Sequence, residues 1–280
     1  MDHHFRAFSF VDRITSIEPG ARICGEYLIP SALDNFAPSL AAEAVGQLAA
    51  WAAMAKMDFA RRPVAGLAGE IEMLHPIRPG KRLELTADLE TVEADAAAYG
   101  GSVLVDGVLA IRLRHCVGPM LAVEDFDDPA ALRARYGVLC NGGATPGGFG
   151  GLPAFPLVRT GGEAAQRVAA TLHVPTQANF FADHFPRRPV FPGTLLMNAS
   201  LELAGFLAKE LAAPAAGGAW ALRGVSDVKL RAFTPPGEIL DIEARLNQFS
   251  PEAATVNVEI RKGKRVVGGA RVRLAAEDRL

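Results

Sequence analysis

The chain has 280 residues, of which 50% are hydrophobic and 21% charged, and its formal net charge is −2. A chain of this length and composition can bury a large core, either as one large domain or as two medium ones. The charges are scattered along the chain, which argues against a nucleic-acid groove or a membrane-binding stripe. No apolar run reaches the ~20 residues of a membrane span. We therefore expect neither a nucleic-acid partner nor a membrane.

The cysteines and the first ten residues bear on the cellular compartment. The three cysteines, Cys24, Cys116 and Cys140, are widely spaced and odd in number, so they indicate neither a disulfide framework nor a metal site. The opening residues, MDHHFRAFSF, lack the basic head and apolar core of a signal peptide. These features predict a cytoplasmic protein.

In chain order, the first long element is an apolar helix over residues 40–55, which is apolar nearly all round and should be buried. Residues 69–92 then show a strand pattern, a Pro79–Gly80 turn and a second strand pattern. A further strand pair follows, joined at Asp106–Gly107. The first half therefore reads as one buried helix with several antiparallel strands.

A short helix and a glycine-rich stretch end the first half. Asp128 can cap the helix and Gly137 suits its end. The glycines that follow are too dense for a packed element, so they predict a linker. The expected organisation is an N-terminal unit at 1–137, a linker at 138–153 and a C-terminal unit at 154–280.

The second half repeats the pattern of the first. An apolar helix is expected at 194–211, and residues 224–249 contain two strand patterns around Pro236–Gly237. Another strand pair follows through Lys262–Gly263. One long helix wrapped by a twisted antiparallel sheet is the hotdog arrangement, so the sequence predicts an α+β double hotdog whose sheets join edge to edge. The alternative is two unrelated α+β domains.

Three stretches resemble the 3-hydroxyacyl-acyl-carrier-protein dehydratases of fatty acid synthesis. These stretches are FSFVDRITSIEPGARI (8–23), HFPRRPVFPG (184–193) and GVSDVKLRAFTPPGEIL (224–240). The loop at 184–193 is the most specific of them, whereas the Pro-Gly turns alone are weak evidence. The resemblance covers most of the chain, with one family unit in each half.

The resemblance also implies where the site residues lie. In that family a loop histidine is followed 14 positions later by a carboxylate on the buried helix, and then by a glutamine four positions further. Counting from His184 reaches Asn198 and Glu202, so the second half has lost the acid and the glutamine. The first half lacks the histidine loop, but its helix carries Glu43 and Gln47, which share one face at i, i+4. In homodimeric relatives each site takes its histidine and carboxylate from different subunits, so His184 and Glu43 are expected to meet between the halves.

The residue types suit the removal of water from a 3-hydroxyacyl thioester. A neutral His184 can take the α-proton, and Glu43, with its pKa raised on an apolar helix, can protonate the leaving hydroxyl. The Gly193 N–H at a helix N-terminus can hold the carbonyl oxygen, and Gln47 can orient Glu43.

An acyl tunnel is expected between the two long helices. We expect Phe191, Pro192, Leu195 and Leu196 to contact the substrate there.

The leading interpretation is a dehydratase that forms trans-2-enoyl thioesters at one composite site. A hotdog thioesterase that uses a carboxylate and water, or an inactive scaffold of a fatty acid or polyketide pathway, remains an alternative. No metal or other cofactor of the protein is expected, because the sequence contains no ligand cluster and no phosphate-binding glycine loop. The substrate is expected on the phosphopantetheine of an acyl carrier protein or on coenzyme A. Chain length, carrier, direction and assembly stay open, and a homo-oligomer is possible.

Overall fold

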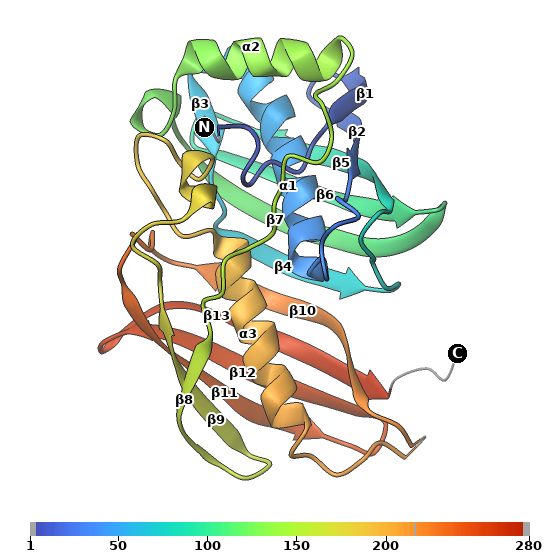
Figure 1. Ribbon diagram of the computed structural model, residues 1–280, viewed down its shortest axis with the longest axis vertical. Helices are drawn as coiled ribbons and strands as arrows, with labels where there is room; N and C mark the ends of the chain where they lie inside the picture. Colours follow the sequence, from blue (N-terminus) through green and yellow to red (C-terminus); the bar gives the residue numbers. More distant parts are fainter. Residues whose placement is uncertain (1–3, 216, 277–280) are drawn as a thin grey trace.

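The computed structural model describes residues 4–215 and 217–276. Its strands form one continuous antiparallel sheet in the order β1-β2-β5-β6-β7-β4-β10-β13-β12-β11-β9-β8, and the short β3 pairs with β7. Figure 1 shows α1 lying across the N-terminal half of this sheet and α3 across the C-terminal half. The double hotdog predicted from the sequence is confirmed.

The N-terminal half contains two helices and seven strands among the described residues. Its elements are β1 (Arg13–Glu18), β2 (Arg22–Leu28), α1 (Pro38–Lys56), β3 (Arg61–Pro63), β4 (Leu67–Met73), β5 (Arg82–Val92), β6 (Ala96–Val105), β7 (Val108–Ala122), the 3-10 turn η1 (Val123–Asp125) and α2 (Pro129–Cys140). The C-terminal half follows with β8 (Leu157–Glu163), β9 (Arg167–His173), the 3-10 turn η2 (Asn179–Ala182), α3 (Gly193–Ala208), β10 (Trp220–Leu230), β11 (Ile239–Phe249), β12 (Ala253–Lys262) and β13 (Arg265–Ala276).

The two half-sheets join through β4 and β10, which pair antiparallel with Ile71 opposite Val225. This pairing satisfies one edge of each half-sheet inside the molecule, as expected from the cost of an open edge. Both long helices are mostly buried and pack against the strands and against each other. The junction of the sheets and the meeting of the helices therefore coincide in the middle of the molecule.

Two details differ from the sequence-based expectation. The strands on either side of Pro79–Gly80 are not neighbours, because β6 and β7 lie between β5 and β4. The Asp106–Gly107 turn does join the adjacent strands β6 and β7, and both residues have positive φ as a two-residue hairpin requires. Alternation identified the strands correctly, and sequence adjacency identified the partners across Asp106–Gly107 but not across Pro79–Gly80.

The helix before the linker is longer than expected. The Asp128 side chain accepts a hydrogen bond from the Ala130 N–H at 3.2 Å, as a helix cap should, but α2 continues past Gly137 to Cys140. The following glycine-rich segment contains no helix or strand up to β8. It packs on the N-terminal half, where the buried Phe149 ring lies edge-on to Phe10 at 5.1 Å. This aromatic contact holds the connection against the first unit.

Candidate active site

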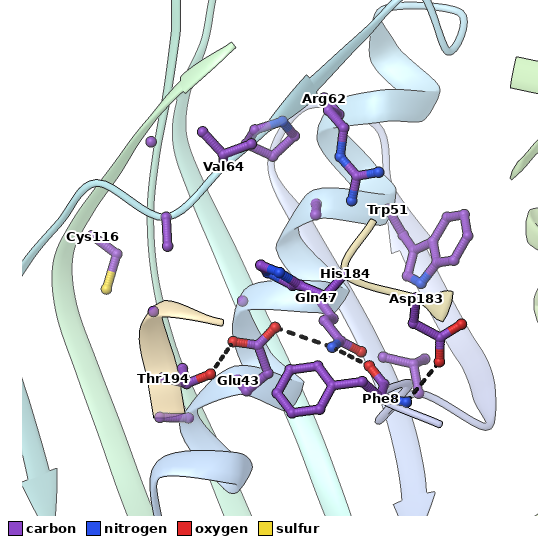
Figure 2. A pocket seen from close by; sticks show the side chains of 18 of the residues that line it. Phe8, Glu43, Gln47, Trp51, Arg62, Val64, Cys116, Asp183, His184 and Thr194 are labelled. Carbon is purple, nitrogen blue, oxygen red and sulfur yellow. Dashed lines mark hydrogen bonds between the residues drawn. The ribbon is translucent and has the colours of Figure 1, made fainter. Parts of the chain in front are cut away.

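Glu43 lies on α1 as a polar side chain within a buried, apolar helix. Its Oε1 accepts a hydrogen bond from Gln47 Nε2 at 3.0 Å, and its Oε2 accepts one from Thr194 Oγ1 at 2.9 Å (Figure 2). Thr194 belongs to α3, so this carboxyl group links the two halves directly. Burial raises the pKa of Glu43, although the hydrogen bonds from Gln47 and Thr194 and the charge of Arg62 oppose the rise.

His184 follows the η2 turn in the C-terminal half. Its Nδ1 lies 2.8 Å from the Val190 carbonyl oxygen. A carbonyl can only accept, so Nδ1 carries the proton and Nε2 of the neutral ring is left with a lone pair. Backbone bonds from His184 N to the Phe180 carbonyl and from Val190 N to the His184 carbonyl, both 2.9 Å, close the loop around the ring.

The electrostatics of His184 keep it neutral. Burial, helped by the nearby Arg62 cation, lowers the pKa of the imidazole to about 4, although the hydrogen bond to the Val190 carbonyl opposes the shift. Glu43 is shifted in the opposite direction. Opposite shifts let a neutral base and a protonated acid coexist in one site, which is the arrangement that acid–base chemistry needs.

Gly193 is the first residue of α3 and follows Pro192. A Cβ at this position would lie 2.2 Å from Leu230 Cδ1, so the tip of the Leu230 side chain would have to move to make room for it. The N–H groups of a first helical turn have no partner within the helix, and they lie at its positive end. The backbone here is therefore suited to receive developing negative charge.

One cavity of about 190 Å³ brings four of the expected residues together. Glu43 and Gln47 line it from the N-terminal half, and His184 and Gly193 line it from the C-terminal half. Figure 2 shows the His184 ring and the Glu43 carboxyl directed into the same space. The expected meeting of a C-terminal histidine with an N-terminal carboxylate is thus seen in the geometry.

The expected acyl-contact residues are placed differently. None of Phe191, Pro192, Leu195 and Leu196 lines this cavity; Phe191 and Leu196 line a smaller one of about 30 Å³. On α3, the turn that presents Gly193, Thr194 and Met197 to the main cavity directs the intervening side chains elsewhere. Leu195 is fully buried in the core instead. Substrate contact by the four expected residues stays a prediction.

The apolar walls of the cavity come mainly from the N-terminal half. They consist of side chains from α1, α2 and the sheet strands near the junction: Ala50, Trp51, Met54, Ile71, Leu113, Val117, Leu132, Leu139, Val228 and Leu230. The space therefore begins between the two helices and continues along α1, rather than following α3.

The N-terminal segment, residues 5–10, ties the two halves together beside the site. Phe8 N donates to Asp183 Oδ2 at 2.6 Å, next to His184, and Phe5 N also bonds to this carboxylate. Gln47 Nε2 donates to the Phe8 carbonyl at 2.9 Å, and its Oε1 accepts from Phe10 N at 2.8 Å. Gln47 thus fixes both Glu43 and this segment.

Sequence reasoning missed Thr194 and Arg62. Thr194 directly follows the glycine of the loop motif and lies in the first turn of α3. Its place at a helix N-terminus expected to face a carboxylate could have identified it as a hydrogen-bond donor to Glu43. Arg62 lies on β3 in a stretch without any motif, and its guanidinium carbon lies 3.9 Å from the centre of the Phe185 ring. Only the folded structure brings it beside His184 and Glu43.

Neither a metal site nor a membrane-spanning helix is found among the described residues. Within residues 4–215 and 217–276, no group of three or more His, Cys, Asp or Glu side chains is arranged to hold a metal ion. Over the same described part of the chain, no helix is both long and apolar enough to cross a membrane.

Comparison with known protein families matches residues 157–279 to the FabA-like domain. Curated relatives include the 3-hydroxyacyl-acyl-carrier-protein dehydratase FabZ of Rhizorhabdus wittichii, 36% identical over 84 residues, which are 30% of this chain and 54% of that protein. The FabZ of Lactococcus lactis subsp. cremoris is 33% identical over 97 residues, which are 34% of this chain and 66% of that protein. The chain thus matches little more than half to about two thirds of each relative's length. The resemblance predicted from the sequence motifs is confirmed over this part.

Solved structures resemble nearly the whole chain, but at low sequence identity. A candidate oleoyl thioesterase from Lactobacillus plantarum has a TM-score of 0.59 and 11% identity, covering 93% of this chain and 98% of its own. A MaoC-like dehydratase has a TM-score of 0.54 and 14% identity, covering 92% and 98%. An acyl-ACP thioesterase from Bacteroides thetaiotaomicron has a TM-score of 0.53 and 14% identity, covering 90% and 97%. At these identities the likeness shows the fold alone.

Proposed function

We propose, from the premise that residues 157–279 are a FabA-like domain, that the chain dehydrates 3-hydroxyacyl thioesters to trans-2-enoyl thioesters at one composite site. The observation that carries this proposal is the pairing of His184 and Glu43 in one cavity, with pKa values shifted in opposite directions. The FabZ relatives support the same reaction type.

The reaction begins at His184. Its Nε2 lone pair takes the proton from the α-carbon of the acyl group, and negative charge develops on the thioester oxygen. The Gly193 N–H at the start of α3 stabilises that oxygen. This donor is fixed before the reaction, so no reorganisation is needed when the charge appears.

The leaving group departs with the help of Glu43. The carbon–oxygen bond at C3 breaks as the Glu43 carboxyl donates its proton, so that the hydroxyl leaves as water and the C2–C3 double bond forms. Each of these proton transfers contributes about 10²–10⁴-fold in rate. A proton then passes from His184 to Glu43, either directly or through solvent, and restores both groups. The chemistry uses no cofactor of the protein, because the thioester carrier already activates the α-carbon.

The carrier and the place of action belong to the proposal as well. The name of the FabZ relatives includes the acyl carrier protein, which supports a substrate linked to that carrier through phosphopantetheine. We further propose that the protein acts in the cytoplasm. Coenzyme A presents the same thioester, and hydration of an enoyl thioester is the same reaction in reverse. One chain already contains the whole composite site, so the proposed reaction does not require an oligomer. A homo-oligomer of this chain would also be compatible with it.

Incubation of the purified chain with 3-hydroxyacyl and enoyl thioesters on both carriers, scored by mass, tests the proposal. Loss of water, or its addition to the enoyl compounds, is expected. The Glu43→Gln variant serves as the matched control, because it keeps the side-chain shape and removes the acidic proton. Release of free acid would instead identify a thioesterase, and unchanged thioesters would identify a non-catalytic scaffold.

A further inference from the structure

Arg62 is a buried cation with unpaired hydrogen-bond donors. Its side chain is 12% exposed and lines the main cavity. Neither Nε nor Nη1 has a hydrogen-bond partner among the described residues, and Asp127 Oδ2 lies 3.9 Å from Nη1, beyond hydrogen-bond distance. A buried guanidinium normally finds partners for its donors, because leaving them unpaired is costly.

Asp127 forms a long ion pair with Arg62, but its oxygens have other hydrogen-bond partners. Asp127 Oδ1 accepts from Asp128 N at 2.8 Å, and Asp127 Oδ2 lies 3.2 Å from His4 Nε2. The guanidinium of Arg62 is instead stacked at 3.9 Å over the Phe185 ring, the residue next to His184. Stacking fixes the position of the cation without using any of its N–H groups.

The position of Arg62 limits which group of a substrate could accept hydrogen bonds from its unpaired donors. Arg62 stacks on Phe185, the residue next to His184, and it lines the same cavity as His184 and Glu43, so it lies near the reacting end of that cavity. The phosphate of phosphopantetheine is separated from the thioester by the whole pantetheine arm, so a group of the acyl chain is better placed than the carrier. Guanidinium groups bind carboxylates with short, charge-assisted hydrogen bonds.

We propose that Arg62 binds a carboxylate on the acyl chain, so that the site prefers 3-hydroxyacyl thioesters that carry a second, ionised carboxyl group. This inference rests on the proposed function and adds the substrate class. Burial lowers the pKa of Arg62 to about 10, so the side chain stays charged at neutral pH. The raised pKa of Glu43 favours its neutral form, which does not repel a substrate carboxylate.

The test compares two 3-hydroxyacyl thioesters of equal chain length, one ending in a methyl group and one in a carboxylate. The quantity measured is the ratio of their kcat/KM values at one pH, because a general change in the His184 pKa then cancels. Arg62→Met keeps an unbranched apolar stem and removes the guanidinium with its charge. Arg61→Met removes a charge from an exposed residue on the same strand that does not line the cavity, and it is the matched control.

We expect the wild type to favour the carboxylated substrate and Arg62→Met to reduce that ratio about 10- to 100-fold, as for a lost hydrogen bond to a charged group. Arg62→Lys should retain part of the preference, and it replaces Arg62→Met if that variant does not fold. An unchanged ratio in a folded Arg62 variant, or a wild type without the preference, would overturn the inference.

A separate readout distinguishes failure of this inference from failure of the proposed function. If the wild type dehydrates neither thioester, the proposed function fails, and binding of the two thioesters is then measured by calorimetry. Tighter binding of the carboxylated compound that disappears in Arg62→Met would still support recognition by Arg62. Equal binding by wild type and variant would overturn it.

Discussion

The two long helices present the same positions to each other, but only one of the resulting sites is equipped for chemistry. Glu43 and Asn198 occupy the same place in α1 and α3, counted from the helix starts at Pro38 and Gly193. Thr194 Oγ1 donates to Glu43 at 2.9 Å. At the matching position of the other helix, Ser39 Oγ donates to Asn198 Oδ1 at 3.3 Å.

The difference lies in the groups that would react. Asn198 replaces the carboxyl group, and Pro38 replaces Gly193 and therefore has no N–H to offer to an oxyanion. The connection from β2 to α1 spans only residues 29–37, whereas the connection from β9 to α3 spans 174–192 and includes the His184 loop. The contact between the helices is present on both sides, whereas the proposed base, acid and backbone donor lie on one side only.

The largest effect should come from removing either half of the acid–base pair. We expect His184→Ala and Glu43→Gln each to lower kcat/KM by about 10²–10⁴-fold, because each removes one proton transfer. The double variant should be little worse than either single variant, since groups that act as a unit are non-additive. Steady-state kinetics check the rates, and circular dichroism checks that the fold survives. Independent, multiplicative losses would contradict a shared site.

Gly193→Pro gives the start of α3 the residue that stands at the start of α1. Proline is well tolerated at the first helical position, but it removes the N–H that is proposed to hold the oxyanion. The new side chain also meets Leu230, and Gly193→Ala carries the same clash while keeping the N–H. We expect the proline variant to lose about 10²–10³-fold more in kcat than the alanine variant. Equal losses would mean that packing, not the N–H, requires the glycine.

Thr194 donates to a carboxyl group that titrates, whereas Ser39 donates to an amide that does not. Removing the two hydroxyl groups should therefore affect the pH profile of kcat/KM differently. Thr194 lowers the pKa of Glu43, and Thr194→Val should therefore raise it further. Because Glu43 must be protonated to donate, the alkaline limb of the kcat/KM profile should move to higher pH. The acid limb, set by His184 near pH 4, should stay in place.

Ser39→Ala is the matched control for Thr194→Val, since its partner Asn198 does not titrate. It should leave both limbs of the profile unchanged. A shift of similar size in both variants would show that the effect comes from the helix contact in general rather than from Glu43.

The sequence predicted the repeated pattern of helix and strands, because apolar periodicity is local. The expected pairing of His184 with Glu43 came from the resemblance to the dehydratase family, and the structure places both residues on one cavity. The sequence did not predict the course of the cavity or the roles of Thr194 and Arg62, because these depend on how α1, α3 and β3 meet in space. Asp183 shows the same limit. It is a departure from the resembled loop, and only the structure shows that it holds the N-terminal segment through the N–H groups of Phe5 and Phe8.

The smallest effect is expected at Asn198, on the side without the reacting groups. Its amide is half-buried, and its oxygen accepts the single bond from Ser39. Asn198→Ala should cost about 1 kcal/mol in the free energy of unfolding, as for one ordinary hydrogen bond. Chemical denaturation measures this cost, and kcat/KM should stay at the wild-type value because Asn198 does not line the cavity of His184 and Glu43. A substrate analogue that binds covalently should saturate at one equivalent per chain in both proteins. Two equivalents, or an Asn198→Ala variant as inactive as His184→Ala, would show that the second position is a working site after all.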